Sequence, residues 1–401
     1  MRVMRALLLE NVHPDAVELL AESGVEVQTV RSALPAEALA ERLAGVHLLG
    51  IRSKTQLDAA ALAAAPDLLA VGAFCIGTNQ VDLDSASHRG VAVFNAPFSN
   101  TRSVVEMALA EMISLTRRLT EKSAALHDGR WDKSADGAHE MRGRCLGIVG
   151  YGNIGSQLSV LAEALGLRVV FYDTADKLAL GNAQRCASLK ELLVEADVVT
   201  LHVDGRTGNA GLFTEEQFAQ MRSGAVFLNL SRGFVVDHSA LAAAVRSGHL
   251  AGAAVDVFPD EPHASGDPFE SDLRGLPNVI LTPHIGGSTE EAQQDIGRYV
   301  AGKLRAYVAT GSTTMSVNMP PIALQQPLGE HRVAHVHRNV PGVLAAVNGI
   351  LAQHQVNVDG QLLSTAGDLG YVLTDVGADL APDVVEELRA MPETIRLRVL
   401  S

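Results

Sequence analysis

The feature that most constrains the fold of this chain is a glycine-rich segment at residues 150–155, which follows the apolar run 145–149. A second apolar run, 168–172, ends at Asp173. A strand, a glycine turn, a helix and a second strand that ends in an acid form the βαβ unit that binds a dinucleotide. The sequence therefore predicts a nucleotide site at the start of the helix that follows the turn.

Each glycine of this segment has its own predicted role. Gly150 allows the tight turn after the strand, and Gly152 lets the backbone approach a pyrophosphate. Gly155 lets the helix pack closely against the strand, and free N–H groups at the helix start can bind the phosphates. Asp173 can accept a hydrogen bond from a ribose 2′-hydroxyl and repels a 2′-phosphate. The segment therefore predicts NAD, and not NADP, as the cofactor.

The charge balance of the chain argues against some classes of partner. Its 401 residues include 32 Lys and Arg against 46 Asp and Glu, a net charge of −14. An acidic chain without basic runs is a poor candidate for nucleic acid or anionic membrane, so we expect neither partner. The apolar run 6–9 stops at Glu10, too short for a secretion signal, and no run reaches membrane-spanning length. The three cysteines are far apart in apolar surroundings, which is typical of reduced thiols in a cytoplasmic protein rather than of a metal site.

The alternation of apolar runs before the glycine turn predicts a first parallel sheet with helices on its faces. The expected strands are 6–9, 25–30, 47–52, 68–76 and 91–94, with helices at 13–22 and 35–43 and a turn-rich segment at 77–90. A single long helix over 101–125 is expected to connect this sheet to the next one.

From residue 145 the alternation resumes and predicts a second parallel sheet, of the doubly wound Rossmann type. The last helix expected in this part is 289–309, after which a proline-containing stretch without periodicity reads as a linker. The order of runs between 332 and 400 is βαββαβ, which is the ferredoxin-like arrangement. This last domain has no glycine-rich turn and no catalytic cluster, so a regulatory or assembly role is expected for it.

Three polar side chains follow strands of the second expected sheet: Arg232, Glu261 and His284. Ligands of an open α/β sheet bind at the carboxyl ends of its strands, so these side chains are expected to converge on one crevice. An Arg can bind a carboxylate through two parallel hydrogen bonds, and a His can take the proton of an alcohol as hydride leaves. A carboxylate beside that His raises its pKa and fixes its tautomer. Each residue alone is typical of a loop or solvated turn, but three at the strand ends of one nucleotide-binding sheet indicate hydride transfer.

These motifs resemble those of the D-isomer-specific 2-hydroxyacid dehydrogenase family. The glycine-rich segment 150–155, Asn-Leu-Ser-Arg-Gly at 229–233, Ala-Val-Asp-Val-Phe at 254–258 and Leu-Thr-Pro-His-Ile-Gly-Gly-Ser-Thr at 281–289 appear in the family's order. Within the family, the resemblance is closest to the shorter bacterial members that oxidise 3-phosphoglycerate. It rests on segments 74–82 and 95–103 and on a C-terminal domain similar to an ACT domain, and it covers nearly the whole chain.

The resemblance implies roles for single residues of the second sheet. Arg232 would orient the substrate carboxylate, His284 would be the acid/base and Glu261 its partner. The residues that would contact NAD, besides the three glycines of the turn, are Asn153, Ile154, Asp173, Leu230, Ser231, Arg232, Asp256, His284, Gly286 and Gly287.

The same resemblance implies the domain boundaries. Residues 1–98 and 287–318 would form a discontinuous, flavodoxin-like substrate domain, and residues 99–286 the NAD-binding domain. Residues 319–330 would be a linker and 331–401 the ACT domain. Gly286 and Gly287 would then act as a hinge on which the substrate domain closes over the cofactor.

The segment Arg52-Ser53-Lys54 and Asn100 stand where this family binds substrate. Two cations and a hydroxyl at the end of a strand suit a phosphate. In relatives inhibited by L-serine, the positions that match His337, Asn339 and Asn357 hold this amino acid across a dimer of ACT domains. This chain differs nearby, with Arg338 where relatives commonly have an acid and Val340 where they have Arg.

The activity implied by the resemblance is the NAD-dependent oxidation of 3-phospho-D-glycerate to 3-phosphooxypyruvate (phosphohydroxypyruvate), the first step toward L-serine. Feedback inhibition by L-serine and a homotetramer assembled through the ACT and NAD domains are also implied, with Trp131 near a subunit contact. Two alternatives remain open. One is the same chemistry on hydroxypyruvate, glyoxylate or 2-oxoglutarate, against which Arg52 and Lys54 argue. The other is a non-catalytic NAD-sensing binding protein, which the presence of all three catalytic candidates disfavours.

Overall fold

The structure is a computed structural model that describes residues 3–262, 266–323, 329–377 and 380–400. Its contacts divide the chain into two compact units. The first unit contains Met1–Ser99 and Gln293–Ser401, and the second contains Asn100–Ala292. The first sheet and the C-terminal domain therefore belong to one unit, whereas the glycine turn lies in the other.

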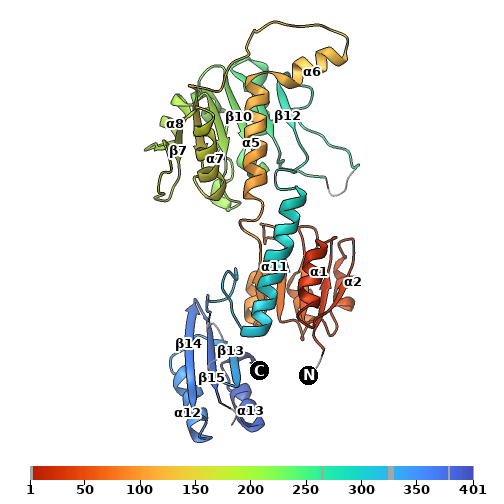
Figure 1. Ribbon diagram of the computed structural model, residues 1–401, viewed down its shortest axis with the longest axis vertical. Coiled ribbons are helices and arrows are strands. Elements are labelled where there is room, and N and C mark those ends of the chain that lie inside the picture. The colour runs from red at the N-terminus through yellow and green to blue at the C-terminus, as the bar shows by residue number, and fades with distance from the viewer. Residues whose placement is uncertain (1–2, 263–265, 324–328, 378–379, 401) are drawn as a thin grey trace. The chain divides into compact units, whose positions relative to one another are not determined.

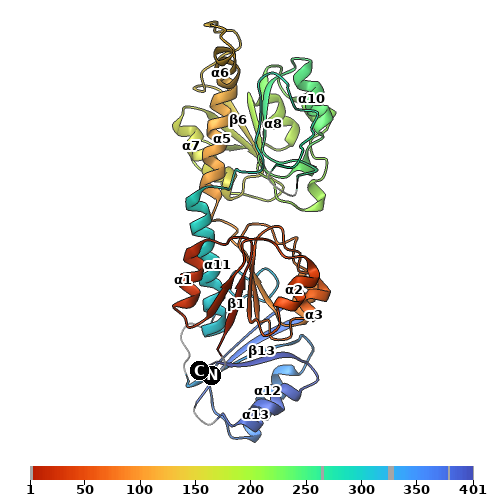
Figure 2. The same cartoon turned by 90° about the vertical axis from the view of Figure 1, so that its right-hand side faces the viewer.

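A parallel five-stranded sheet is the centre of the first unit. Its strands are β1 (Arg5–Leu8), β2 (Glu26–Thr29), β3 (Leu48–Ile51), β4 (Ala70–Ala73) and β5 (Ala92–Phe94), in the spatial order β2-β1-β3-β4-β5. Its helices are α1 (Pro14–Ala21), α2 (Ala36–Arg42), α3 (Ala59–Ala63), α4 (Leu83–His88) and α11 (Glu290–Thr310). Helices α1 and α11 lie on one face and α2 and α3 on the other (Figure 2). The apolar side chains of α1 and α11 belong to one core beside the sheet, and those of α2, α3 and α4 to the other. All residues of β3, β4 and β5 are buried, as expected for parallel strands covered on both faces.

A parallel seven-stranded sheet is the centre of the second unit. Its strands are β6 (Cys145–Val149), β7 (Arg168–Tyr172), β8 (Gln184–Arg185), β9 (Val198–Leu201), β10 (Ala225–Asn229), β11 (Leu250–Val255) and β12 (Val279–Leu281). The spatial order is β12-β11-β10-β9-β6-β7-β8, so the direction of winding reverses between β6 and β9. A crevice at the carboxyl ends of the strands next to such a reversal is where doubly wound sheets bind ligands.

Helices cover both faces of this second sheet. They are α5 (Thr101–Thr116), α6 (Leu119–His127), α7 (Asn153–Ala164), α8 (Leu189–Glu195), α9 (Glu215–Gln220) and α10 (His238–Arg246), with short 3-10 turns η1 (Thr207–Asn209) and η2 (Gly233–Val235). Helices α5 and α7 lie side by side on one face (Figure 1), and the apolar residues of α8, α9 and α10 pack on the other. The predicted Rossmann-type fold is confirmed.

The C-terminal part of the first unit is an antiparallel sheet with the predicted βαββαβ order. Its elements are β13 (His331–Arg338), α12 (Val343–Gln353), β14 (Val358–Ala366), β15 (Leu369–Val376), α13 (Pro382–Ala390) and β16 (Thr394–Leu400), with strand order β14-β15-β13-β16. One face packs on α12 and α13, and the other shares a core with the first sheet. In this shared core the Tyr371 hydroxyl donates to the Gly311 carbonyl at 2.7 Å. The buried Arg332 guanidinium pairs there with Asp375 at 2.6 and 2.8 Å.

Some predicted elements are wrong. The single helix expected over 101–125 is two helices, α5 and α6, which are separated where Arg118 adopts a left-handed φ of 54°. The turn-rich segment 77–90 contains a helix, α4, and α3 was not predicted at all. Of the predicted linker 319–330, residues 324–328 lie outside the described residues. None of the described helices combines the length and the apolar character needed to cross a membrane.

Candidate active site

The glycine turn after β6 has the geometry that a pyrophosphate site needs. Gly150 has φ 94°, and a Cβ atom there would lie 2.6 Å from the carbonyl oxygen of His202. A Cβ atom on Gly155 would overlap the carbonyl oxygen of Gly150, so neither position accepts a side chain. By contrast, the position of a Cβ on Gly152 has no described atom within 4 Å. The backbone at Gly152 therefore faces open space at the start of α7, where N–H groups of the first helical turn lack helical partners.

The acid at the end of β7 lies beside this turn. One carboxylate oxygen of Asp173 accepts from the N–H of Tyr151 at 2.8 Å, and the other accepts from the N–H of Ala175 at 2.8 Å. A carboxylate has about four acceptor positions, so both oxygens keep the capacity to accept from ribose hydroxyls. The turn, the helix start and Asp173 together fit a dinucleotide whose ribose carries a free 2′-hydroxyl.

The loop after β10 is held by a buried amide. Asn229 is fully buried, its Oδ1 accepts from Ser231 Oγ at 2.8 Å, and its Nδ2 donates to the Arg232 carbonyl at 3.1 Å. These bonds fix the backbone that carries Arg232. Sequence reasoning used Asn229 only as part of a motif, and its location directly before the candidates Leu230, Ser231 and Arg232 was the available signal.

The loop that carries Arg232 packs directly against the loop after β11. A Cβ atom on Gly233 would overlap the carbonyl carbon of Phe258, so only glycine permits this approach. The N–H of Phe258 in turn donates to Glu261 Oε1 at 3.1 Å. Arg232 and Glu261 therefore come from two loops in contact.

His284 and Glu261 form a hydrogen-bonded pair. Nδ1 of His284 lies 3.1 and 2.9 Å from the two carboxylate oxygens of Glu261. The hydrogen bond with Glu261 raises the pKa of His284, against the effect of burial and of the Arg232 charge. Burial disfavours the ionised form of Glu261, but hydrogen bonds from His284 and from the Phe258 N–H lower its pKa overall. With Nδ1 engaged, Nε2 is the ring nitrogen left for a substrate.

Asp256 fixes the loop on which His284 stands. Its Oδ1 accepts from Thr282 Oγ1 at 2.6 Å and from the N–H of Ile285 at 2.9 Å, and Oδ2 accepts from the N–H of Gly286 at 2.8 Å. The N–H of His284 donates to the Asp256 carbonyl at 2.8 Å. His284 itself has a left-handed φ of 54°, a strained conformation for a residue with a side chain. Asp256 was predicted as an NAD contact, and the structure gives its carboxylate the task of holding this strained loop.

The remaining cofactor candidates lie at the same carboxyl edge of the second sheet. They are Asn153 and Ile154 in the first turn of α7, Leu230 and Ser231 directly after β10, and Gly286 and Gly287 after His284. Asn100 precedes α5, and its Nδ2 would overlap a Cβ atom on Gly287. The structure therefore brings Asn100 to the loop of His284.

The other predicted substrate residues belong to the first unit. Arg52, Ser53 and Lys54 follow β3, and the side chains of Ser53 and Lys54 are exposed. The chain lies at the carboxyl end of a parallel strand here, which is the position expected for a ligand-binding loop.

Sequence reasoning missed a buried acid next to the site. Glu111 lies on α5, is 5% exposed, and neither of its carboxylate oxygens has a hydrogen-bond partner among the described residues. Burial, with a smaller effect of the Asp256 charge, raises the pKa of Glu111 to about 8. Glu111 shares the helical spacing of the apolar positions Val104, Ala108 and Leu115 on α5, which was the available signal, whereas Glu106 falls on the exposed face of the same helix.

The candidate effector residues lie at two ends of the C-terminal sheet. His337 packs on Gly370, is 3% exposed, and its Nε2 has no hydrogen-bond partner among the described residues. Asn339 donates to the carbonyl of Gly367, in the turn between β14 and β15. Asn357 precedes β14, and the first residues of β14 and of β13 both pair with Val376. Asn357 therefore lies at the start of β13, whereas His337 and Asn339 lie at its end. Within one domain, roughly 20 Å along the strands separates Asn357 from the other two residues.

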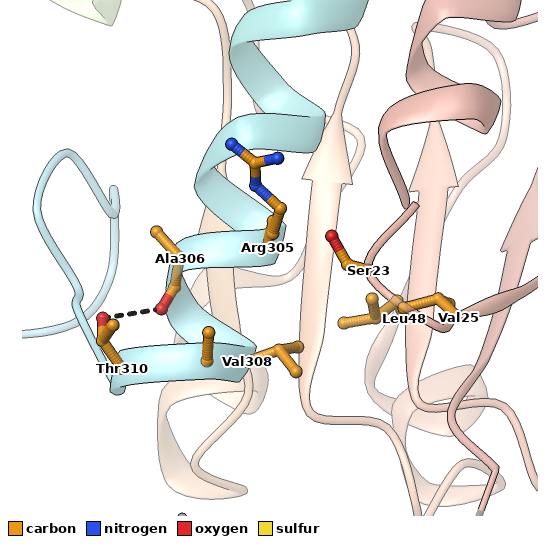
Figure 3. Close-up of a pocket in the computed structure, with 8 residues that line it drawn as sticks. Ser23, Val25, Leu48, Arg305, Ala306, Val308 and Thr310 are labelled. Atoms are coloured by element: carbon orange, nitrogen blue, oxygen red, sulfur yellow. Dashed lines mark hydrogen bonds between the residues drawn. The ribbon is translucent and has the colours of Figure 1, made fainter. Parts of the chain in front are cut away.

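A pocket of about 360 Å³ lies elsewhere in the first unit (Figure 3). Its lining residues come from the turn between α1 and β2, the start of β3 and the last turns of α11; they are Ser23, Val25, Leu48, Arg305, Ala306, Val308, Ala309 and Thr310. Arg52 follows the other end of β3, so this pocket is separate from the predicted substrate loop.

Comparison with known proteins agrees with the geometry. Residues 109–286 match the family model of the D-isomer specific 2-hydroxyacid dehydrogenase, NAD binding domain, and residues 333–396 match the AHAS small subunit-like ACT domain. A D-3-phosphoglycerate dehydrogenase of Escherichia coli strain K12 is 48% identical over 99% of this chain and 97% of its own length. One of Dictyostelium discoideum is 47% identical over 99% of this chain and 97% of its own length.

A solved structure resembles about three quarters of the chain. The D-lactate dehydrogenase of Aquifex aeolicus, complexed with NAD and lactic acid, has a TM-score of 0.65 and 25% identity, and covers 76% of this chain and 95% of its own. The cofactor of the second unit is accordingly NAD. From its fold, its site and its relatives, this chain belongs to the D-isomer-specific 2-hydroxyacid dehydrogenase family.

Proposed function

We propose that this chain oxidises 3-phospho-D-glycerate to 3-phosphooxypyruvate with NAD, and so supplies the 2-oxo acid precursor of L-serine. The observation that carries the proposal is near full-length similarity, at 47–48% identity, to proteins named D-3-phosphoglycerate dehydrogenase. The location proposed for this activity is the cytoplasm.

The geometry of the second unit supports the proposed catalytic roles. The turn before α7 would hold NAD, which would supply the acceptor for the hydride that leaves C2 of the substrate. Nε2 of His284 takes the hydroxyl proton, and the Glu261 carboxylate stabilises the imidazolium that forms, 2.9 Å from Nδ1. Arg232 binds the substrate carboxylate through its planar pair of N–H donors. The roles of the cofactor residues named above, with Asp173 on the ribose, belong to the same proposal.

In this proposal, side chains of the first unit bind the phosphate of the substrate. Arg52, Ser53 and Lys54 offer two cations and a hydroxyl at the end of β3, and Asn100 offers an amide from the second unit. Residues 1–98 and 287–318 act as the substrate domain and 99–286 as the NAD domain, with Gly286 and Gly287 as the hinge.

L-serine is the proposed effector, bound between two copies of the ACT domain. The separation of Asn357 from His337 and Asn339 within one domain supports a shared site, because a two-fold axis through the β14 edge places unlike ends of two domains together. The buried, unpartnered Nε2 of His337 suits a ligand that brings its own polar group. A homotetramer formed through ACT and NAD domains completes the proposal, with the exposed Trp131 at a contact between NAD domains.

One experiment tests substrate, cofactor and effector together. The reduction of phosphohydroxypyruvate by NADH is measured with and without L-serine, and hydroxypyruvate, glyoxylate and 2-oxoglutarate serve as competing substrates. The proposal expects the phosphorylated acid to be preferred and its turnover to fall with L-serine. Folded protein that reduces none of these acids would disprove the catalytic proposal, and a preference for an unphosphorylated acid would replace the substrate.

A further inference from the structure

A buried carboxylate binds the backbone of the loop that carries the predicted phosphate ligands. Glu10 is 8% exposed, although it lies at the end of a strand. Its Oε1 accepts from the N–H of Thr55 at 2.8 Å and from that of Arg52 at 3.2 Å. Its Oε2 accepts from the N–H of Lys54 at 3.0 Å. Three of the four N–H groups of residues 52–55 are therefore bound by one side chain.

The sheet brings Glu10 to this loop. Strands β1 and β3 are parallel neighbours, with Leu8 paired to Gly50, and the N–H of Leu9 donates to the Gly50 carbonyl at 2.8 Å. Two residues further along each strand, Glu10 and Arg52 leave the sheet side by side. Glu10 and Asn11 then adopt left-handed φ values of 63° and 55°, a region that Asn visits readily but Glu does not. Such strain at Glu10 persists only where the surroundings impose it, and the three hydrogen bonds that its side chain accepts favour this conformation.

The opposite side of the loop is also fixed. Gln80, 4% exposed, donates from Nε2 to the Arg52 carbonyl at 2.6 Å. The backbone of Arg52 is thus held from both sides, by an acceptor at its N–H and a donor at its carbonyl. Its guanidinium, by contrast, has no hydrogen bond or ion pair with any residue in the described ranges.

We propose that Glu10 is a positioning residue for phosphate recognition. Its carboxylate occupies the backbone N–H groups of the 52–55 loop, so these cannot bind the ligand, and phosphate recognition is left to the side chains of Arg52, Ser53 and Lys54. This inference rests on the proposed function, because it names how that same site selects a phosphorylated substrate.

The charge arrangement explains how selection arises. A cluster of backbone N–H groups at a loop is a general anion site that accepts any carboxylate or phosphate. With this cluster already occupied by Glu10, an incoming anion is repelled from the backbone side of the loop. The ligand is then bound on the solvent side, where the cations of Arg52 and Lys54 favour a dianionic phosphate over a neutral hydroxyl.

The test is Glu10→Gln, which keeps the size of the side chain but replaces one acceptor oxygen by a donor NH₂. We expect KM for phosphohydroxypyruvate to rise by about tenfold or more, which is ~1.4 kcal/mol of binding. The turnover number and KM for NADH should change by less than about threefold. The decrease in kcat/KM for hydroxypyruvate should be several times smaller than the decrease in kcat/KM for the phosphorylated acid. Amide hydrogen exchange of residues 52–55 should accelerate by about tenfold or more as these N–H groups lose their acceptor.

The matched control is Asn318→Ala in the same unit. Asn318 accepts from the N–H of Val93 at 2.8 Å and donates to the Val91 carbonyl at 2.9 Å, so its loss also removes backbone hydrogen bonds, but at the edge strand β5. This variant should lower stability without changing the preference for the phosphorylated acid or the exchange of residues 52–55.

Two results would overturn the inference. Unchanged exchange of residues 52–55 in Glu10→Gln would show that Glu10 does not hold the loop, whether or not the variant is less stable. An equal decrease in kcat/KM of Glu10→Gln for the two substrates would show that the loop does not select phosphate. Wild-type protein without turnover of either acid would instead refute the proposed function, and the exchange measurement would still decide the role of Glu10.

Discussion

The two carboxylate oxygens of Glu261 lie 3.1 and 2.9 Å from Nδ1 of His284, on a loop that Asp256 holds with a left-handed φ at His284. Glu261 and Asp256 therefore hold His284 in two different ways. Glu261 sets its charge and tautomer, Asp256 sets the position of its backbone, and Nε2 is left for the reaction.

Glu261→Gln should move the pH dependence of catalysis. The hydrogen bond with Glu261 raises the pKa of His284, so its removal lowers that pKa. Oxidation needs the neutral imidazole, which is present above this pKa, so the acid limb of kcat/KM should shift to lower pH. Reduction needs the imidazolium, so as the pH rises the variant should lose its reductase activity at a lower pH than the wild type. The rate of reduction at neutral pH should fall by roughly tenfold or more. Glu270→Gln, which removes an exposed ion pair with Arg274, is the control, and coincident pH profiles would contradict the assignment.

Asp173→Asn should weaken the preference for NADH over NADPH. The neutral amide no longer repels a 2′-phosphate and accepts more weakly from ribose, so KM for NADH should rise by about tenfold. The ratio of kcat/KM for the two cofactors should narrow by at least that factor. Asp176→Asn, at an exposed acid three residues away that pairs with Arg185, should leave the ratio unchanged. A ratio unaffected in Asp173→Asn would mean that another residue selects the cofactor.

The double variant Arg52→Gln with Lys54→Gln tests the substrate. Each charge-assisted hydrogen bond to phosphate contributes about 1.5–3 kcal/mol, so kcat/KM for phosphohydroxypyruvate should fall by roughly a hundredfold or more. The loss on hydroxypyruvate should stay below about fivefold, because this acid has no phosphate. Arg305→Gln, at the exposed arginine that lines the pocket of Figure 3, is the control for a simple loss of positive charge in this unit. An equal decrease in kcat/KM for the two acids would favour an unphosphorylated substrate.

Glu111→Gln should change how stability depends on pH. In the folded protein the pKa of Glu111 is raised from 4.5 to about 8, so between these values the folded state holds a proton that the unfolded state has lost. The contribution of Glu111 to the free energy of unfolding is fully present below the pKa that this group has in the unfolded state. It decreases as the pH rises toward 8, by about 1.4 kcal/mol per pH unit at most. The glutamine variant has no such slope, so its free energy of unfolding relative to the wild type should increase from pH 5 to pH 8. Urea unfolding at both pH values measures the difference. Glu106→Gln on the same helix, 58% exposed and paired with Arg102, should show no such trend.

Much of this architecture could be predicted because its signals are local in sequence. Buried parallel strands appear as short apolar runs, and the residues that follow them necessarily share one edge of the sheet, which is how Arg232, Glu261 and His284 were found. The break at Arg118 could not be predicted in this way. No glycine or proline marks it, and the left-handed φ is accompanied by hydrogen bonds from the Arg118 guanidinium to Glu121 and by its packing over Gly137.

The supporting residues depended on contacts that are distant in sequence. Glu10 binds a loop more than forty residues away, and the helix that carries Glu111 packs against strands that begin more than a hundred residues later. The residue type of both predicts exposure, and only Glu111 carries a local signal of burial, because it shares the spacing of the apolar face of α5. Only the folded sheet shows that one carboxylate holds a loop and that the other has no partner among the described residues.

The close approach of Gly233 to Phe258 has a consequence for how this protein is mutated. The loop of Arg232, the arginine proposed to bind the substrate, can approach the loop of Glu261 this closely only because Gly233 has no Cβ atom. In an alanine scan, Gly233→Ala adds a single carbon and would rank among the mildest substitutions by volume. It would push apart the two loops that form the site, so the smallest side chain in this part of the chain is the one least open to change.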